Sequence, residues 1–264
     1  MRRIALFSDI HGNLPALDAV LEGIGSLGLE ETYCLGDLVG YGPNPSGVVE
    51  RIRNSGIPTI MGNYDEGIGT RRGECGCYYA SEQARADGAE SYAFTDGAVS
   101  DMDRSWLAAL PGEIRLEHQG VRILLTHGSP RKINEYLLLD RQDAQLARLA
   151  DQAAADVVCV GHVHIPYHRT MGASEGRAVH YVSSGSVGKP KDGDPRAAWV
   201  EVVFGSEGEV RRAAEGDGAI GPAGTTPTWV GVATHRVEYD IDAVAEAMSA
   251  AGLPATLAAA LRQR

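Results

Sequence analysis

The sequence predicts a layered α/β fold, and three observations indicate it. Short apolar runs alternate with segments of helical spacing over residues 3–61, which is the β-α-β-α-β pattern of a sheet covered by helices. The apolar runs lack polar alternation, as is typical of strands buried on both faces. Several more strand-like runs follow between residues 113 and 204. We therefore expect a second sheet that stacks on the first.

The first elements are predicted from local signals. Residues 3–8 form a continuous apolar run, which predicts the first strand. Asn13 is a good N-cap and Pro15 is tolerated in a first helical turn, so a helix is expected to begin there. Its apolar residues, from Leu14 onward, recur at helical spacing and give it one face for packing on a sheet. A strand, a helix and a strand are then predicted at 32–35, 45–53 and 59–61.

Residues 64–112 break this rhythm, and we interpret them as an inserted helical cap. A helical stretch is expected at about 80–96, and a second short helix holds Trp106 and Leu110 before Pro111. Cys75 and Cys77 lie in this cap. A C-x-C pair without a second pair of Cys or His is poor evidence for zinc, so packing within the cap is the favoured interpretation and metal binding the alternative.

The rest of the chain returns to strands. We expect a helix at about 140–155, a glycine-rich excursion at about 205–231, and a helix at about 240–250 with a short one after it. The excursion is predicted to be a solvent loop or long hairpin, with an active-site lid as the alternative. Strands are predicted at 113–118, 121–126, 156–160, 165–171, 177–183, 197–204 and 233–238. Together the elements predict a single domain over residues 1–264.

Composition excludes several classes of protein. With 264 residues, 44% hydrophobic and 22% charged, the chain can bury a core and is not a disordered protein. A formal charge of −11 repels phosphate backbones, so stable nucleic-acid binding is not expected. No run approaches the roughly 20 apolar residues of a membrane span, and the first apolar run ends too soon for a signal peptide. Four cysteines in 264 residues do not indicate a disulfide framework, so a protein with reduced cysteines in the cytoplasm is expected. The sequence leaves the oligomeric state open.

Five short polar blocks each follow a predicted strand. In an open α/β sheet, the loops at the carboxyl ends of strands line the functional crevice. We therefore expect these blocks to meet at one edge. Their ligand-type side chains are Asp9, His11, Asp37, Asn63, His127, His162 and His164. Any single block could be a helix cap or a solvated pair, but five in this arrangement favour a metal centre.

Seven such ligands suit two metal ions better than one, because a closed zinc site uses about four. Two cations held about 3.5–4 Å apart can clamp the attacking and leaving oxygens of a displacement, and they lower the pKa of bound water towards about 7. The mixture of imidazole, carboxylate and amide favours two divalent transition-metal ions (Mn, Fe, Zn, Co or Ni) over Ca or Mg.

The five blocks, in this order, resemble the signature of the calcineurin-like metallophosphoesterases, and in particular the bacterial YfcE-like phosphodiesterase group. The resemblance spans roughly residues 4–200. It implies a four-layer αββα sandwich of two mixed β-sheets flanked by helices. It also implies that a metal-bridging hydroxide attacks a small phosphoester. The implied ligands are Asp9, His11 and His164 for the first metal and Asn63, His127 and His162 for the second, with Asp37 bridging both.

The chain departs from this signature at Tyr64, where many relatives have a histidine that can protonate the leaving oxygen or steady the phosphoryl group. Tyrosine has a pKa near 10 and is a poorer acid at neutral pH. We therefore expect weak action on alkyl monoesters and better action on phosphodiesters or aryl esters; the alternative is a tyrosine that only packs. Catalytic roles are expected for Asp37, Asn63, Tyr64 and His127, and substrate contacts for Arg131, Tyr41 and Asn44, although Arg131 could be an ordinary surface residue.

Three functions remain open on the sequence alone. The first is a dinuclear phosphodiesterase. The second is a nucleotide pyrophosphatase or dinucleoside polyphosphate hydrolase, which would use the same ligands. The third, of a different class, is a non-catalytic scaffold protein of the same fold, and the complete set of seven ligand positions argues against it.

Overall fold

The computed structural model describes residues 1–29, 31–214 and 220–262, and these form two mixed five-stranded sheets. The order in the first sheet is β2 (Thr32–Cys34), β1 (Arg2–Phe7), β8 (Ala197–Gly205), β10 (Trp229–Val237) and β9 (Gly221–Pro222). The order in the second is β3 (Glu113–His118), β4 (Val121–Thr126), β5 (Val157–Val160), β7 (Ala178–Ser184) and β6 (Pro166–Gly172). Strands β1 and β2 are parallel, as are β4, β5 and β7, while the remaining pairs are antiparallel.

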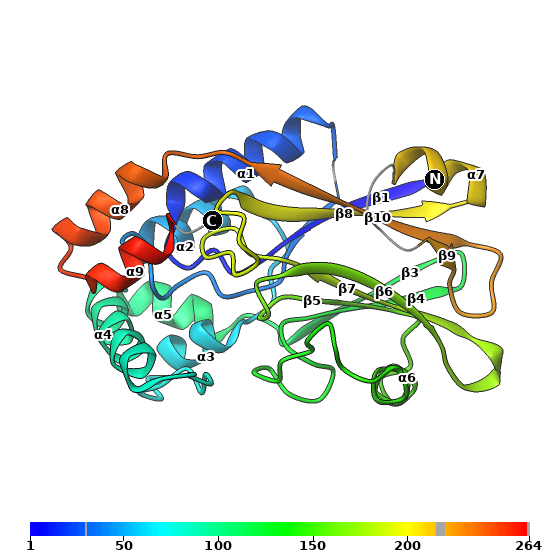
Figure 1. Cartoon of the computed structure of the whole chain (residues 1–264), viewed down its shortest axis with the longest axis horizontal. Coiled ribbons are helices and arrows are strands. Elements are labelled where there is room, and N and C mark those ends of the chain that lie inside the picture. Colours follow the sequence, from blue (N-terminus) through cyan, green and yellow to red (C-terminus); the bar gives the residue numbers. More distant parts are fainter. Residues whose placement is uncertain (30, 215–219, 263–264) are drawn as a thin grey trace.

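The two sheets stack on each other and helices flank them (Figure 1). Helices α1 (Leu14–Ser26) and α2 (Pro45–Ser55) lie beside the first sheet, and α6 (Asp143–Gln152) lies on the outer side of the second. Ile4 and Leu6 of β1 share one buried cluster with Ile123 of β4 and Val157 of β5. Each such side chain contributes about 1.5–3 kcal/mol by leaving water. The predicted two-sheet sandwich is confirmed.

The predicted helix starts agree with the structure. The side chain of Asn13 accepts a hydrogen bond from Ala16 N at 3.2 Å and caps α1, whose buried face includes Leu17 and Val20. The strand expected at residues 59–61 is reduced to a single β-bridge between Thr59 and Cys34. Pro58, directly before Thr59, has no N–H to donate to a ladder.

The region 64–112 is largely helical, as predicted, and its helices lie together at one end of the molecule (Figure 1). They are α3 (Asn63–Gly69), α4 (Glu82–Ala98) and α5 (Asp101–Ala108). Ser81 caps α4 by accepting from Ala84 N at 3.1 Å. The sequence analysis did not anticipate α3, which begins at the candidate ligand Asn63 itself.

The described part of residues 205–231 agrees only partly with the predicted loop or hairpin. Strand β9 (Gly221–Pro222) pairs antiparallel with the start of β10, which makes a short hairpin, but the segment was not expected to hold a helix. It contains α7 (Glu207–Ala213), which a capping box of Ser206 and Glu209 starts. Gly231 of β10 lets this helix pack closely, because a Cβ there would lie 2.6 Å from Val210 Cγ1. Residues 215–219 of the excursion lie outside the described residues. Helix α7 sits beside the N-terminus of β1, at the opposite end of the strand from Asp9, so this helix is not an active-site lid (Figure 1).

The chain ends with α8 (Ile241–Ala250) and α9 (Ala255–Ala260), close to those predicted. Val244 and Met248 of α8 pack on Leu257 of α9 in a small cluster of their own, which Tyr41 also contacts. Among the described residues, no helix has the length and apolar character that crossing a membrane requires.

Candidate metal centre

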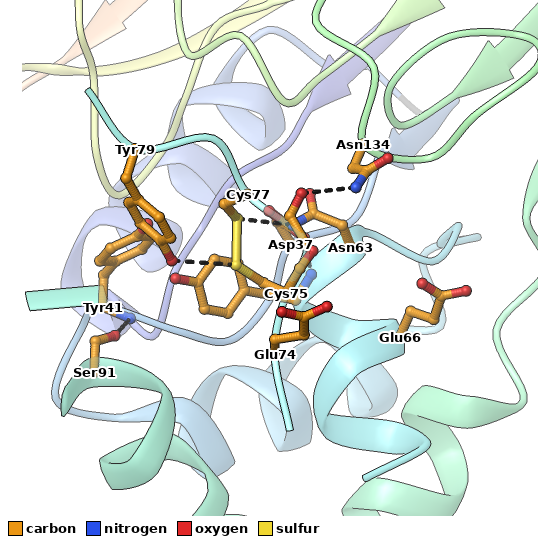
Figure 2. Close-up of a disulfide and its surroundings, with 12 residues drawn as sticks. Asp37, Tyr41, Asn63, Glu66, Glu74, Cys75, Cys77, Tyr79, Ser91 and Asn134 are labelled. Atoms are coloured by element: carbon orange, nitrogen blue, oxygen red, sulfur yellow. Dashed lines mark hydrogen bonds between the residues drawn. A yellow bond between two sulfur atoms is a disulfide. The ribbon is translucent and has the colours of Figure 1, made fainter. Parts of the chain in front are cut away.

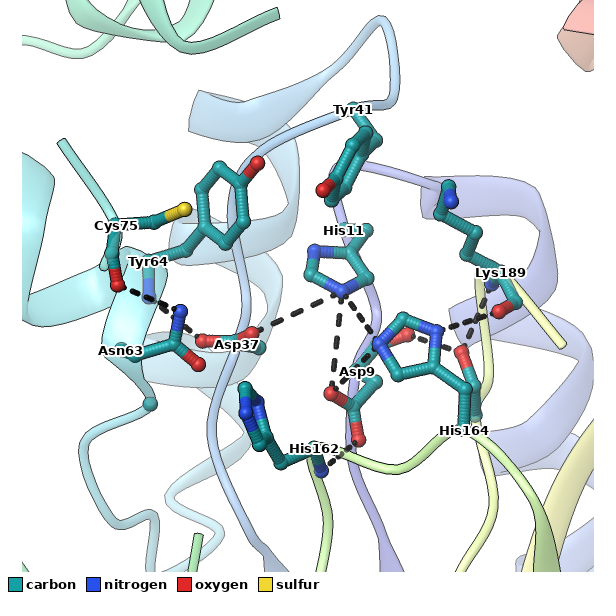
Figure 3. A network of polar contacts seen from close by, with 12 residues as sticks. Asp9, His11, Asp37, Tyr41, Asn63, Tyr64, Cys75, His162, His164 and Lys189 are labelled. Carbon is teal, nitrogen blue, oxygen red and sulfur yellow. Dashed lines mark hydrogen bonds and ion pairs between the residues drawn. The ribbon is translucent and has the colours of Figure 1, made fainter. Parts of the chain in front are cut away.

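The predicted strand-end loops converge at one edge of the sandwich (Figure 3). The first sheet supplies candidate ligands from the loops after β1 and β2, and the second sheet supplies them from the loops after β4 and β5. All seven side chains are at most 3% exposed: Asp9, His11, Asp37, Asn63, His127, His162 and His164. The structure therefore brings together every candidate metal ligand that the sequence analysis named.

The ligand atoms fall into two groups, each within 4.8 Å: Asp9 with His11 and His164, and Asp37 with His127 and His162. Each group combines residues from both sheets. Asn63 adjoins the second group, because its Oδ1 lies 3.1 Å from His127 Nε2. This division is the one that the resemblance implied.

Asp37 lies between the two groups. Its Oδ2 is 3.8 Å from His11 Nε2 and 3.4 Å from His127 Nε2, while its Oδ1 accepts the backbone N–H of Tyr64 at 2.8 Å. A carboxylate in this position can contact two cations at once.

Hydrogen bonds to the backbone orient three of the histidines. Nδ1 donates to Val39 O at 3.0 Å in His11, to Leu35 O at 2.7 Å in His127, and to Lys189 O at 2.6 Å in His164. With the proton on Nδ1, the Nε2 atom of each neutral ring has a lone pair that faces the centre.

The residues present fit two bound cations. Asp9 Oδ1 and His162 Nε2 are buried with no hydrogen-bond partner among the described residues, which is costly unless another group satisfies them. The Nε2 atoms of His11 and His164 lie 3.1 Å apart. Two lone pairs at that distance repel each other unless a proton or a cation lies between or beside them. The donor set of imidazole, carboxylate and amide suits transition metals.

The pKa values of the histidines agree with this fit. Burial lowers the pKa of His11 and of His162 to about 3, and burial together with Lys191 lowers that of His164 to about 4. These rings are therefore neutral ligands at pH 7. Burial also lowers the pKa of His127, but Asp37 outweighs it and raises the value to about 10. In the metal-free protein the negative charge of Asp37 thus favours a protonated His127 ring, at a place where a cation would otherwise balance that charge.

Strained backbone is concentrated at the candidate ligands. Asp9, His11, Asp37, His162 and His164 all have left-handed φ angles, between 50° and 64°. Each such residue costs on the order of 1 kcal/mol or more, which the surrounding packing has to offset. Gly36, just before Asp37, permits the loops to meet closely, because a Cβ there would lie 2.4 Å from Gly62 N.

The sequence analysis gave no role to Asp65, which the structure shows at the base of the centre. This buried carboxylate accepts backbone N–H groups from Asp37 (2.8 Å), Leu38 (2.9 Å) and Gly62 (2.9 Å). It thereby ties the Asp37 loop to the start of α3, which carries Asn63. Burial, and then the negative charge of Asp37, raises the pKa of Asp65 to about 7. A capping-box position three residues after Gly62 was the sequence signal for it.

Cys75 and Cys77 form a disulfide next to Asn63 (Figure 2), so the expectation of reduced cysteines was wrong for this pair. The pair also packs against the neighbouring apolar cluster, as the favoured interpretation held. The amide Nδ2 of Asn63 donates to Cys75 O at 3.0 Å and to Cys77 Sγ at 3.2 Å. These contacts fix the amide so that Oδ1 is the atom next to His127. The other two cysteines, Cys34 and Cys159, are buried free thiols.

Tyr64 and Tyr41 pack around His11. Ring centroids lie 5.4 Å from His11 for Tyr64 and 4.9 Å for Tyr41, both edge-on. The Tyr64 hydroxyl is buried with no partner among the described residues, and burial raises its pKa well above 10. It can therefore act as a hydrogen-bond donor but not as a ready acid at neutral pH.

Two of the expected substrate-binding side chains are engaged by other groups of the protein. The Arg131 guanidinium is 61% exposed and binds both oxygens of Glu135, at 2.7 and 2.6 Å. Asn44 is exposed and caps α2 by accepting from Gly47 N at 3.1 Å. Arg131 thus forms an ion pair and Asn44 caps a helix, so neither side chain is assigned to substrate binding.

Comparisons with known proteins agree with this site. The profile of the calcineurin-like phosphoesterase superfamily domain matches residues 1–204. A Methanocaldococcus jannaschii protein named as uncharacterized is 32% identical over 211 residues, which cover 74% of this chain and 80% of that protein. Phosphodiesterase YfcE of Escherichia coli is 26% identical over 204 residues, covering 74% of this chain and 84% of YfcE.

A solved structure extends the likeness to the whole chain. A metallophosphoesterase from Sphaerobacter thermophilus superposes with a TM-score of 0.66 at 27% identity, covering 99% of this chain and 98% of that one. The resemblance found in the sequence is thereby confirmed. With its two clusters of ligand-type side chains, the chain belongs to the calcineurin-like phosphoesterase superfamily of metal-dependent phosphoric ester hydrolases and is a homologue of YfcE.

Proposed function

We propose that this protein is a dinuclear metal-dependent phosphodiesterase. The observation that carries the proposal is the position of Asp37 Oδ2, which lies within 3.8 Å of His11 Nε2 on one side and within 3.4 Å of His127 Nε2 on the other. A shared carboxylate between two sets of free ligand atoms is the arrangement that two adjacent cations require. The homology to YfcE, which is named a phosphodiesterase, supports the reaction class.

The residues divide between two ion positions. Asp9, His11 and His164 would hold one ion, and Asn63, His127 and His162 the other, with Asp37 in contact with both. When bound, two such ions neutralise phosphoryl charge and lower the pKa of water towards about 7. The metal identity is proposed only as a divalent transition metal, because the donors fit Mn, Fe, Zn, Co and Ni alike.

This chain's own residues orient the reacting groups. The backbone bonds of His11, His127 and His164 keep their Nε2 atoms directed inward before substrate arrives. Such preorganisation lowers the barrier because it costs no rearrangement during the reaction. A Tyr64 hydroxyl that stays protonated can donate to a leaving oxygen but gives up its proton reluctantly, so leaving groups of low pKa are favoured.

The test is hydrolysis of bis(4-nitrophenyl) phosphate with added Mn²⁺, with metal content measured on the same samples. Asp37→Asn and His127→Ala are each expected to lower kcat/KM by at least about 10²-fold, the order of an essential electrostatic group. Asp18→Asn, on the exposed side of α1, and His118→Ala, on β3, are the matched controls. Unchanged rates in both site variants would contradict the proposal.

The metal content of the purified protein distinguishes the proposed enzyme from a non-catalytic scaffold protein. A dinuclear site predicts about two ions per chain after reconstitution. Well under one ion per chain, together with no hydrolysis, would favour a non-catalytic protein of this fold. Against that alternative, all seven ligand positions are filled by side chains that can bind metal and that point to one place.

A further inference from the structure

A cavity of about 660 Å³ opens beside the candidate centre, and none of the seven candidate ligands lines it. It adjoins the centre at three points. Tyr41 packs edge-on against His11, Tyr136 lies over His162 with ring centroids 4.0 Å apart, and Val163 sits between two ligands in sequence. A phosphoester whose phosphorus lies at the centre would therefore place one substituent in this cavity.

The cavity walls are rich in aromatic and aliphatic side chains. Tyr41, Tyr78, Tyr79 and Tyr136 all line it. Tyr78 is 78% exposed and Leu138 is 47% exposed, so large apolar side chains stand uncovered at its mouth. A single exposed residue of this kind needs no explanation, but two at one cavity whose walls are otherwise apolar favour a binding surface. Flat aromatic ligands suit such walls, because stacked rings add about 0.5–1.5 kcal/mol each beyond their buried area.

Positive charge gathers in the same cavity. The chain has only three lysines, and two of them, Lys189 and Lys191, line this cavity. Lys189 Nζ lies 4.4 Å from the centroid of the Tyr41 ring, and Figure 3 shows the two side chains next to each other. Neither lysine forms an ion pair with a carboxylate among the described residues, whereas most arginines near the surface do.

The lysines leave a surplus of positive charge once metal is bound. In the metal-free protein, the carboxylates of Asp9 and Asp37 attract the positive charge of Lys191. Two divalent ions would more than neutralise these carboxylates. The one acid in the cavity lining, Asp87, accepts hydrogen bonds from Gln83 at 2.8 Å and from Thr256 at 2.7 Å, and its single negative charge offsets only one of the two lysines. The loaded cavity therefore favours an anion in addition to the phosphoryl group at the centre.

The far wall of the cavity is built by α9. Thr256, Leu257 and Ala260 line it, and the hydrogen bond from Thr256 to Asp87 ties this helix to α4. These residues lie beyond the part that matches the family profile, which ends at residue 204. The shape of the cavity is thus set partly by a segment outside the shared phosphoesterase core.

We propose that this cavity holds the substituent of the substrate, and that the substituent is an aromatic base joined through a second phosphoryl group, as in a nucleoside pyrophosphate. Lys189 and Lys191 would bind the second phosphoryl group, and the four tyrosines would enclose the ring. The inference rests on the proposed function, since it needs the same metal centre. When the base of the substrate stacks on a tyrosine, a lysine next to that tyrosine is close enough to bind the phosphoryl group attached to the base.

The reaction for this substrate is hydrolysis of a P–O–P linkage. The oxygen of one water forms a bond to the phosphorus at the centre, and the bond from that phosphorus to the bridging oxygen breaks. The bridging oxygen leaves with the second phosphoryl group, and the two protons of water pass to the products or to solvent. No oxidant, reductant or further reactant is needed.

The first experiment compares diadenosine diphosphate with bis(4-nitrophenyl) phosphate in the metal-loaded wild type and in a Lys189→Gln/Lys191→Gln double variant. We expect the double variant to lose at least about tenfold more kcat/KM on the pyrophosphate than on the nitrophenyl ester, the order of one charge-assisted contact. Lys132→Gln, the third lysine and outside the cavity, is the matched control. Equal losses on both substrates would overturn the inference.

The second experiment measures binding without turnover, by calorimetry with adenosine and with the non-hydrolysable methylene-bridged forms of adenosine diphosphate and of pyrophosphate as separate probes. The adenosine diphosphate analogue is expected to bind more tightly than either part alone. Tyr78→Ala, whose exposed side chain cannot disturb the core, is expected to weaken the two adenosine probes and not the pyrophosphate analogue. Equal affinity for the adenosine diphosphate and pyrophosphate analogues would show that the ring adds nothing and would refute the cavity assignment.

The two proposals fail in distinguishable ways. If the wild type hydrolyses neither ester and holds no metal, the proposed function itself is wrong. If it hydrolyses the nitrophenyl ester in an Asp37-dependent manner but shows no preference tied to the two lysines, only the substrate class is wrong.

Discussion

The carboxylate of Asp65 accepts the backbone N–H of Asp37 at 2.8 Å, beneath the point where the two groups of candidate ligands meet. Its second oxygen accepts from Leu38, and the first also accepts from Gly62, so that three N–H groups of two loops depend on one buried side chain. Asp65 is therefore a positioning residue for Asp37, acting through the backbone without facing the centre itself.

Asp65→Asn should weaken metal binding and activity together. An amide can present only one oxygen to these three donors, and its NH₂ group would oppose an N–H. Loss of such a supporting contact costs about 10- to 100-fold in metal affinity or activity. Titration of Mn²⁺ against the hydrolysis rate would show the loss as a higher metal requirement, with partial rescue at saturating Mn²⁺. Glu66→Gln, next in sequence and more exposed, serves as the control. A variant with unaltered metal requirement would argue against the positioning role.

Removing the Cys75–Cys77 disulfide should loosen Asn63. The amide Nδ2 donates to Cys77 Sγ and to Cys75 O, and both contacts depend on the local turn. We expect the Cys75→Ser/Cys77→Ser double variant to lose about tenfold in affinity for the ion next to His127, with smaller effect on the other ion. Stepwise metal titration by calorimetry measures both sites. Cys34→Ser, a buried thiol far from Asn63 in sequence, shows what an ordinary buried Cys→Ser change does. Equal losses at both ions would contradict this account.

Tyr64→His should broaden the range of leaving groups. The tyrosine hydroxyl has a pKa well above 10, whereas an imidazole near neutrality can transfer its proton to a poor leaving oxygen. Across a series of aryl and alkyl phosphodiesters, the variant is expected to gain most, about tenfold or more, on those with leaving groups of high pKa. Tyr64→Phe is the companion variant and should gain on none of them. A uniform change across the series would mean that the side chain only packs.

His180 should make the metal-free protein less stable in weak acid. This fully buried ring donates Nε2–H to Pro222 O at 2.9 Å, and its Nδ1 faces His168. Burial lowers its pKa to about 4, against about 6.5 in the unfolded chain. Below pH 6.5 the unfolded state therefore binds the proton first, and stability falls as the pH falls towards 4.

The loss attributable to His180 is up to about 2 kcal/mol at pH 5. It is measured as the difference in unfolding free energy between pH 7 and pH 5, by denaturant titration of chelated protein. The His180→Gln variant should show a smaller difference than the wild type, even if its stability at pH 7 is lower. An identical pH dependence in both proteins would exclude His180 as a source.

Local sequence signals predicted much of the fold and of the centre. Asn13 and Pro15 marked the start of α1, and polar blocks after buried strands predicted which side chains would meet. That prediction worked because the carboxyl ends of parallel strands share one edge, whatever the details of each loop. Nothing in the sequence showed that five of the ligands adopt left-handed backbone, since this conformation is imposed by the packed loops.

The features that the sequence analysis did not anticipate have physical reasons of the same kind. The many glycines of 205–231 suggested a loop, but one of them, Gly231, serves close packing of α7 on β10. Arg131 follows His127 closely in sequence, yet Glu135 turns its guanidinium towards solvent. Asn44 caps α2, and both an asparagine at the N-cap and a proline directly after it are favoured at a helix start. Each outcome depends on a partner that only the folded chain supplies.

Each candidate ion would be bound by side chains from both sheets. The ions would therefore cross-link the two sheets of the sandwich. Metal binding and the stability of this edge are then linked, because conditions that hold the two sheets together also favour metal binding. Loss of the ions would leave six buried imidazole and carboxylate groups without the cations that join the two sheets. Chelation should therefore increase amide exchange at the strand ends of both sheets at once, and leave the distant end near α7 comparatively protected.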